Sequence, residues 1–338
     1  MSEISVSVAS GSYDRIRALH DGTVKVEGCA IEYHLVEPNQ LFVRNLKSQE
    51  FDVSEMSFST YIAHREQGRA HYTAIPVFLS RAFRHSAIFV RAVRGTGEPV
   101  IASPAELVGK RVGTPEYFTT MLVWMRGLLA DEYGITPADL RWRVGGLEQP
   151  APETVPSQPS SEAPMGGIAI EAIPAGKTLS GMLAAGEIDA LFSARPPSCF
   201  LRGEAVRLFP DYRAVEQAYF RKTGIYPVMH AVGIRNSLLS AHPWLAGRFF
   251  AAFAKAKDMA TADLEKLSAF TVTLPWIEAE YRATQAVLGG DIWPYGTEAN
   301  RKAIETLCRY LHEQGFTKRR MGTEDLFAPM NHLFADEG

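Results

Sequence analysis

A short cluster of charged side chains between two apolar segments is the densest chemical signal in the sequence. Arg81, Arg84 and His85 lie within five residues, between the apolar segments 74–78 and 86–93. Guanidinium groups form forked, charge-assisted hydrogen bonds to carboxylates, and imidazole exchanges protons near neutral pH. The cluster predicts a site for an anionic ligand with a proton-transfer group beside it. A surface turn paired with acidic residues elsewhere is the alternative.

Two further titratable residues lie in predicted strands. His230 interrupts the apolar segment 228–232, and Glu55 lies near the end of the segment 51–57. A carboxylate at the edge of a cleft has its pKa raised by burial, which makes it usable as an acid or a base. Both residues are therefore candidates for proton transfer. The alternatives are a hydrogen-bonded core histidine and a carboxylate that caps a helix.

The loop after the first predicted strand is a candidate anion site. Ser10 and Ser12 precede a predicted helix, and Arg15 follows them. The free N–H groups at the start of a helix, with serine hydroxyls and an arginine, suit a carboxylate. Ordinary helix capping is the competing interpretation.

A second loop of this kind follows the strand predicted over 110–114. It contains Glu116, Tyr117 and Thr119, and it allows the same two interpretations, an anion site or a helix cap. Arg195 ends another predicted strand and is a further candidate for binding a carboxylate.

Alternating strand and helix patterns are expected to position these residues. Period-two and short apolar patterns predict strands over 4–9, 31–36, 51–56, 74–78, 86–93, 110–114, 141–144, 188–192 and 228–234. Helical spacing predicts helices over 14–20, 41–47, 57–65, 117–133, 178–185, 244–259 and 298–314. In the helix over 41–47 we expect Leu41, Val43 and Leu46 to face the core. The alternation predicts an α/β fold with mainly parallel sheets.

The order of these elements predicts a hinged clamshell of two lobes with a ligand cleft between them. We expect residues 1–92 plus 230–338 in lobe 1 and residues 93–229 in lobe 2. Residues 150–165 contain five prolines, which predicts an exposed loop.

Composition limits the classes of partner. The chain has 338 residues, with 35 Lys and Arg against 38 Asp and Glu and a net charge of −3. This balance predicts no binding to nucleic acid or to anionic membranes, so a small molecule is the expected partner. Cys29, Cys199 and Cys308 are too few and too far apart for a disulfide framework. No secretion signal or long apolar run is recognisable, and we expect a cytoplasmic homo-oligomer.

Motifs for common cofactors are absent. The sequence contains no GxGxxG after a strand, no P-loop, no HExxH, no GxSxG and no CxxC. These absences disfavour cofactor-dependent redox chemistry and the use of ATP. No histidine pair has the i, i+4 spacing of helical metal ligands, which disfavours a metal site.

Five segments together resemble the 4,5-dihydroxyphthalate decarboxylase family. They are residues 50–57, 74–78 with 81–86, 109–117, 186–191 and 293–296, and the resemblance extends from about Val6 to Pro329. It implies a fold similar to type 2 periplasmic binding proteins. It also implies loss of one carboxylate from 4,5-dihydroxyphthalate to give protocatechuate, without an organic cofactor. The segment from Ala151 onward departs from the family pattern, and this departure bears on the identity of the substrate.

Such a reaction needs an acid at the ring carbon, an acceptor for a phenol proton and a cation for the remaining carboxylate. His85 and His230 are the candidates for proton transfer, and Glu55 is the second choice as base. The candidate carboxylate clamps are Arg81, Arg84 and Arg195. A divalent metal ion is a second option, because the substrate is a catechol. The rival hypothesis is a cytosolic solute-binding or sensor protein that binds aromatic acids without turnover.

Overall fold

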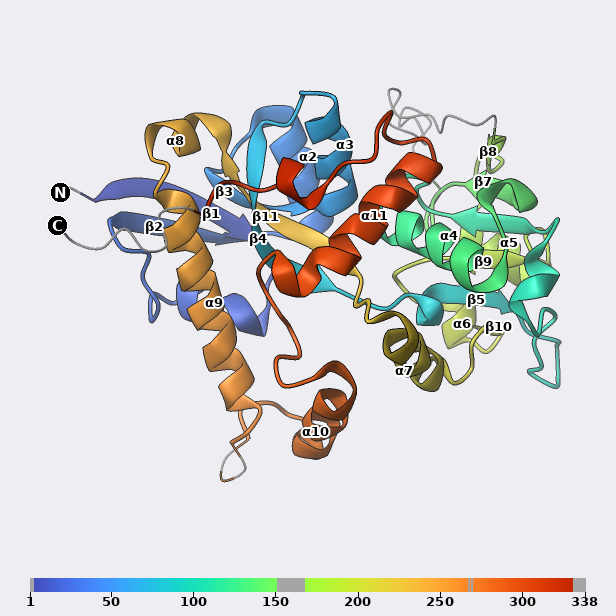
Figure 1. The fold of residues 1–338 in the computed structure, drawn as a ribbon. Helices are drawn as coiled ribbons and strands as arrows, with labels where there is room; N and C mark the ends of the chain where they lie inside the picture. Colours follow the sequence, from blue (N-terminus) through green and yellow to red (C-terminus); the bar gives the residue numbers. More distant parts are fainter. Residues whose placement is uncertain (1–2, 151–167, 267, 269, 331–338) are drawn as a thin grey trace. The chain divides into compact units, whose positions relative to one another are not determined.

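The computed structural model describes residues 3–150, 168–266, 268 and 270–330. The chain forms two compact units (Figure 1). The first contains Met1–Arg81, Val228–Glu305 and Met321–Gly338, and the second contains Ala82–Pro227 and Thr306–Arg320. Each unit has its own mixed sheet, and the α/β class predicted from the sequence is confirmed.

The first unit is built on a five-stranded sheet in the order β2-β1-β3-β11-β4. Its strands are β1 (Ile4–Ser10), β2 (Cys29–Leu35), β3 (Val53–Ser57), β4 (Tyr72–Arg81) and β11 (Val228–Arg235). β1 pairs in parallel with β2 and β3, whereas β11 pairs antiparallel with β3 and β4. β11 therefore brings a distant part of the chain next to the end of β3.

Helices of the first unit pack on this sheet. They are η1 (Asp14–Ile16), α1 (Arg17–His20), α2 (Pro38–Ser48), α3 (Phe58–Glu66), α8 (Asn236–Ala241), α9 (Leu245–Asp263), α10 (Ile277–Leu288), η5 (Glu298–Asn300) and η6 (Thr323–Asp325). In α2 the prediction for two residues was wrong, because Val43 and Leu46 are exposed. The buried positions are Leu41 and Asn45, whose i, i+4 spacing forms a single narrow face.

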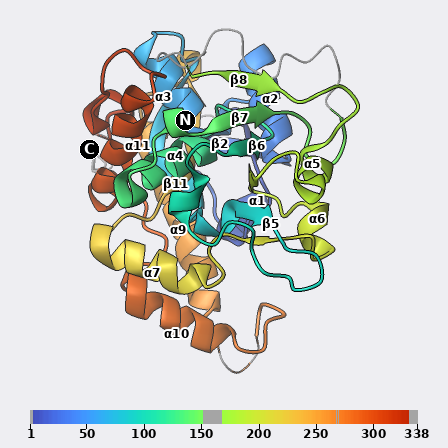
Figure 2. The ribbon, with the colours of Figure 1, turned by 90° about the vertical axis from the view of Figure 1, so that its right-hand side faces the viewer.

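The second unit has a six-stranded sheet in the order β10-β5-β9-β6-β7-β8. Its strands are β5 (Ile88–Arg91), β6 (Arg111–Thr114), β7 (Arg141–Val144), β8 (Ile170–Ala172), β9 (Ala190–Phe192) and β10 (Ala205–Arg207). β6, β7 and β8 run parallel and side by side (Figure 2). β5 pairs antiparallel with β9 and β10, so the segment 82–92 belongs to this unit and not to the first, where the sequence had placed it. An apolar strand alone does not reveal which sheet it joins.

Short helices complete the second unit. They are η2 (His85–Ala87), η3 (Pro104–Leu107), α4 (Thr120–Tyr133), η4 (Pro137–Asp139), α5 (Leu179–Ala185), α6 (Ser198–Leu201) and α7 (Tyr212–Thr223), and most of α11 (Arg301–Glu313) belongs here as well. α4 begins later than its apolar pattern suggested, because Thr119 caps it by accepting from Leu122 N at 3.3 Å. Of the predicted proline-rich loop, residues 151–165 lie outside the described residues. No helix within the described ranges is long and apolar enough to cross a membrane.

Candidate active site

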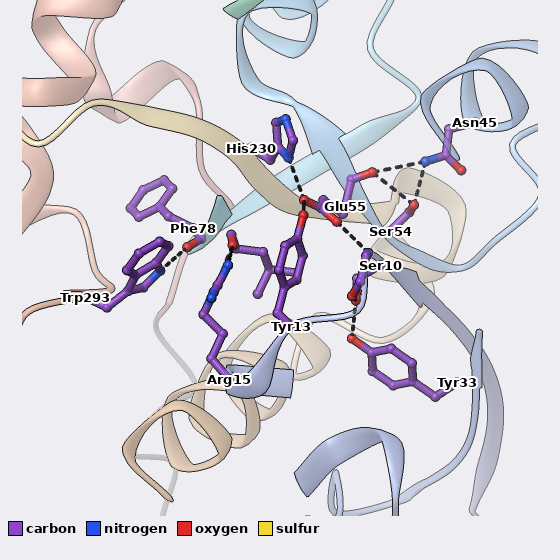
Figure 3. A network of polar contacts seen from close by, with 12 residues as sticks. Ser10, Tyr13, Arg15, Tyr33, Asn45, Ser54, Glu55, Phe78, His230 and Trp293 are labelled. Carbon is purple, nitrogen blue, oxygen red and sulfur yellow. Dashed lines mark hydrogen bonds and ion pairs between the residues drawn. The ribbon is translucent and has the colours of Figure 1, made fainter. Parts of the chain in front are cut away.

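Three donor groups converge on one buried carboxylate in the first unit (Figure 3). Glu55 in β3 is 0% exposed. Its Oε1 lies 2.6 Å from His230 Nδ1 and accepts a 2.8 Å hydrogen bond from the Tyr13 hydroxyl. Its Oε2 accepts from the Gly11 backbone N–H at 2.8 Å. Both carboxylate oxygens therefore have partners, as a buried charge requires.

Strand register explains how these residues meet. In the antiparallel β3–β11 pair, His230 lies opposite Ser57 and Val232 lies opposite Glu55. Residues two apart on a strand share a face, so His230 and Glu55 are diagonal neighbours on the same face of the sheet. Parallel pairing of β1 with β3 brings the loop after β1 to the same edge.

Gly11 is required by the close packing of this loop. A Cβ on Gly11 would lie 2.8 Å from Cζ and from the hydroxyl oxygen of Tyr13, which is closer than such atoms approach. The missing side chain lets the Tyr13 ring fold over the loop while the Gly11 N–H points at Glu55. The loop thus supplies two of the three donors.

The electrostatics of the group favour an ionised carboxylate beside a neutral phenol. Burial by itself would raise the pKa of Glu55, but the hydrogen bonds from His230, Gly11 and Tyr13, and the charge that His230 carries when it is protonated, outweigh burial, so the pKa is lowered. Burial and the adjacent Glu55 charge raise the pKa of the Tyr13 hydroxyl. Glu55 accordingly carries the negative charge and Tyr13 keeps its proton.

His230 is the member of the group that can exchange a proton with a ligand. Its side chain is 20% exposed, and its ring packs edge-on against Phe42 with centroids 4.9 Å apart. Because the ionised Glu55 accepts at Nδ1, we assign the hydrogen to Nδ1. Nε2 has no hydrogen-bond partner among the described residues, so this nitrogen is available to accept a proton.

Ser10 and Ser12 have different positions in the same loop. Ser10 is buried, donates to Gly11 O at 2.9 Å and lies 2.8 Å from the Tyr33 hydroxyl. Ser12 is exposed. The loop was predicted from the sequence as an anion site, but Tyr13, its central residue in the structure, was not singled out. A tyrosine directly after Gly-Ser was the available signal.

Arg81 also lies in the first unit, and its guanidinium donates hydrogen bonds to other residues of the chain. Its side chain is buried, and Nη2 donates to Pro294 O at 2.7 Å and to Asn300 Oδ1. It therefore anchors the segment that follows α10. Its predicted role as a carboxylate clamp remains a prediction.

Arg84 and His85 lie in the second unit beside α7. His85 is 1% exposed, and its ring lies between those of Phe209 and Tyr219, with centroid distances of 5.3 and 5.5 Å. Burial lowers the pKa of His85 to about 4 and that of Arg84 to about 10, where the nearby Glu216 charge opposes the shift. His85 is consequently neutral at pH 7, and its predicted catalytic role remains untested.

The other predicted site residues of the second unit are separate from that cluster. Thr119 caps α4, and Tyr117 is buried with its ring over the Arg126 guanidinium at 4.1 Å. Glu116 and Arg195 are both exposed. These positions are consistent with structural roles for Thr119 and Tyr117, and ligand binding by any of the four residues remains a prediction.

No group of three or more His, Cys, Asp or Glu side chains suited to a metal ion occurs within the described part of the chain. The Glu55 group contains one carboxylate and one imidazole, which suit proton transfer.

Comparison of the sequence with known proteins identifies two similar enzymes. The chain is 39% identical over 331 residues to the 4,5-dihydroxyphthalate decarboxylase of Comamonas testosteroni. This alignment covers 97% of the present chain and 98% of that protein. It is 40% identical over 225 residues to the 4,5-dihydroxyphthalate decarboxylase of Pseudomonas putida, over 65% of this chain and 83% of that protein. No protein-family model matches the chain.

Solved structures show the fold. The periplasmic aliphatic sulphonate-binding protein SsuA from Escherichia coli aligns with a TM-score of 0.53 at 14% identity, over 99% of both chains. The alkanesulfonate-binding protein SsuA from Xanthomonas axonopodis pv. citri aligns with a TM-score of 0.50 at 12% identity, over 97% of this chain and 98% of that one. The predicted periplasmic-binding-protein fold is confirmed.

Proposed function

The chain belongs to the 4,5-dihydroxyphthalate decarboxylase family, and we propose that it converts 4,5-dihydroxyphthalate to protocatechuate and CO2 with Glu55, His230 and Tyr13 as its proton-transfer group. The 39% identity to a 4,5-dihydroxyphthalate decarboxylase over 97% of this chain supports this choice of substrate. The observation that carries the assignment of residues is the 2.6 Å contact between His230 Nδ1 and the buried Glu55 carboxylate.

The reaction sets specific demands on proton transfer. Direct loss of CO2 would leave an electron pair in the plane of the ring, where the π system cannot delocalise it. Removing the proton of the hydroxyl para to the reacting carbon enriches that carbon in electrons, so that it can take up a proton first. Loss of CO2 then restores the aromatic ring, and the phenolate regains its proton. In balance, one proton supplied by the solvent enters the ring for each CO2 released, while the phenol proton is removed and returned.

His230 suits the first of these steps. In the Nδ1–H form its Nε2 accepts the phenol proton, and the positive charge that results on the imidazole is stabilised by Glu55 at the other nitrogen. Tyr13 and Gly11 hold Glu55 in place. After CO2 has left, His230 returns its proton to the phenolate oxygen.

A binding protein or sensor without turnover is the second candidate. The similarity in fold to two sulphonate-binding proteins favours it, because those proteins are named for binding alone. The two candidates differ in one observable, which is product formation.

The test is incubation of the purified protein with 4,5-dihydroxyphthalate in D2O, with chelator or with added divalent metal, followed by mass spectrometry. We expect protocatechuate with one deuterium on the ring. His230→Gln should reduce turnover by roughly 100- to 10,000-fold. His242→Gln, which replaces a ring that lies edge-on to Trp244 with centroids 5.8 Å apart, is the matched control and should keep the turnover of wild type. Binding of the acid without any product would favour the sensor.

Compartment and assembly are part of the same proposal. We place the reaction in the cytoplasm, which is supported by the three buried free thiols, Cys29, Cys199 and Cys308, as in a reducing compartment. Cell fractionation tests this placement. The homo-oligomer expected from the sequence remains a prediction for light scattering.

A further inference from the structure

A rigid loop lies against the Tyr13 side of the candidate site. Trp293 Nε1 donates to Phe78 O at 2.8 Å, and Gly296 N donates to Pro76 O at 2.9 Å. Asn300 Nδ2 donates to Pro294 O at 3.0 Å and to Gly296 O at 2.7 Å. These bonds fix residues 293–296 on β4, although the segment has no regular secondary structure of its own.

This loop and Tyr13 enclose the guanidinium of Arg15. The Arg15 carbon Cζ lies 4.3 Å from the Tyr13 ring centroid and 4.2 Å from a Trp293 ring centroid. Nε and Nη2 both donate to Leu79 O, with Nε at 2.9 Å. The side chain is 15% exposed, so this cation is stacked, anchored and still reachable.

Arg15 retains hydrogen-bonding capacity. A guanidinium has five N–H groups. Two donate to Leu79 O, and one donates from Nη1 to Asp14 Oδ1 at 3.1 Å, where Asp14 is 51% exposed. The remaining two have no partner among the described residues. A fixed guanidinium with unused donors is suited to a carboxylate.

Tyr295 provides a second unused group in the same place. The residue is 9% exposed, and its buried hydroxyl has no hydrogen-bond partner among the described residues. Tyr295 belongs to the same short loop as Trp293, whose ring lies 4.2 Å from the Arg15 guanidinium. Burial raises the pKa of the Tyr295 hydroxyl, and the charges of Arg15 and Arg81 oppose the rise. Burial of an unpaired hydroxyl is unfavourable unless a ligand or water pairs with it.

We propose that Arg15 and the Tyr295 hydroxyl bind the carboxylate that remains on the ring after decarboxylation. This inference rests on the proposed function, and it makes Arg15 the residue that selects an aromatic dicarboxylic acid over a plain catechol. Tyr13 joins the two parts of the site, because its ring covers Arg15 while its hydroxyl shares Glu55 Oε1 with His230.

Chemistry favours the remaining carboxylate over the departing one. A cation bound to the departing carboxylate stabilises the ground state more than the neutral CO2 that forms, and so it opposes the reaction. A cation on the remaining carboxylate keeps its partner throughout. Charge-assisted bonds of this kind orient the ring without adding to the barrier.

Calorimetric binding of two non-reacting probes tests the proposal without any need for turnover. Protocatechuate carries the remaining carboxylate and catechol lacks it. For Arg15→Gln we expect the Kd of protocatechuate to rise about 10- to 100-fold and the Kd of catechol to change less than about 2-fold. The matched control is Arg248→Gln, since Arg248 also stacks on an indole, that of Trp244 at 4.6 Å, and donates to a backbone carbonyl. Both affinities should keep their wild-type values in that control.

Tyr295→Phe is the second variant, and it removes one oxygen that has no hydrogen-bond partner in the described parts of the chain. It should fold normally and weaken protocatechuate about 3- to 10-fold, again with catechol unaffected. The proposal is overturned if protocatechuate binds Arg15→Gln and Tyr295→Phe as tightly as wild type. Equal weakening of both probes also overturns it, because Arg15 would then only support Tyr13. A protein that binds protocatechuate through Arg15 but does not decarboxylate would contradict the proposed function alone.

Discussion

The two units each contain a buried pair of histidine and glutamate, and the two pairs hold their charges in opposite ways. In the first unit Glu55 Oε1 lies 2.6 Å from His230 Nδ1, and the pKa of Glu55 is lowered. In the second unit the closest nitrogen of His85 lies 3.9 Å from Glu216, burial lowers the pKa of His85 to about 4, and burial raises the pKa of Glu216. The same two residue types thus accompany glutamate pKa shifts of opposite direction in the two places.

The type of donor beside each carboxylate explains this difference. Glu55 receives a backbone N–H, a phenol hydroxyl and an imidazole. Glu216 receives backbone N–H groups of Ser86 and His85 and the Ser86 hydroxyl, and its nearest His85 ring nitrogen is 3.9 Å away. Burial penalises both carboxylates, and the imidazole at hydrogen-bond distance is the donor that only Glu55 has.

Glu55→Gln is expected to have the largest effect. The amide keeps the shape but cannot stabilise a positive imidazole, so kcat should fall roughly 100- to 10,000-fold while the fold persists. Steady-state kinetics with 4,5-dihydroxyphthalate measure the effect. Glu32→Gln is the matched control, since Glu32 pairs with His34 at 3.3 Å on the surface. Full activity in Glu55→Gln would show that His230 does not need the charge of Glu55 to transfer protons.

The neutral form of His85 should make the free energy of unfolding depend on pH in acid. A pKa lowered from 6.5 to about 4 means that the unfolded chain binds more protons than the folded one in this window. The stability contributed by neutral His85 is therefore complete above pH 6.5 and is lost as the pH falls toward 4, by about 3 kcal/mol. Urea unfolding of wild type and His85→Gln at pH 7 and pH 4 measures this. The variant should lose about 3 kcal/mol less between the two pH values, and an identical loss would show that His85 is not buried in its neutral form.

The same variant separates the roles of the two histidines. If the comparison holds, His85→Gln should retain kcat within about 10-fold of wild type, whereas His230→Gln should lose far more. A larger loss for His85→Gln would return the proton transfer to the residue that the sequence favoured.

Tyr13→Phe should have a smaller effect on the charged pair. It removes one donor to Glu55, which costs about 2 kcal/mol of unfolding free energy because the acceptor is charged. Loss of that donor raises the pKa of Glu55, so the acidic limb of the kcat/KM profile should move to higher pH. A profile with an unchanged acidic limb would contradict the role of Tyr13 as a donor to an ionised Glu55.

Local patterns predicted the elements better than they predicted the site. The strand over 4–9, the loop with Ser10 and the strand carrying Glu55 could be inferred from apolar spacing and Gly-Ser chemistry. His230 was correctly placed in an apolar strand. The contact between Glu55 and His230 depends on the β3–β11 register across 175 positions of sequence, and no local pattern contains that information.

The cluster from Arg81 to His85 shows what charge spacing leaves out. Its density of charge made it the strongest signal in the sequence, yet charge density does not report burial. Arg81 bonds to Pro294 O and Asn300 within the first unit, and His85 is enclosed by aromatic rings in the second. Both environments are formed by residues more than 100 positions away, which only the tertiary structure brings together.

Glu216→Gln should produce the smallest effect, and one of opposite sign to that of Glu55→Gln. Because burial raises the pKa of Glu216, its ionised form is disfavoured by folding, and the favourable contribution of the protonated form is lost as the pH rises through that raised pKa. A glutamine keeps an oxygen to accept from Ser86 N without any charge to bury. At pH 7 the variant should unfold with a free energy equal to wild type or up to about 1 kcal/mol higher, whereas at pH 4 this advantage should vanish. Glu55→Gln should be less stable than wild type at pH 7 in the same urea titration. If both variants were destabilised at pH 7 to the same extent, the imidazole beside Glu55 would not explain the difference between the two carboxylates.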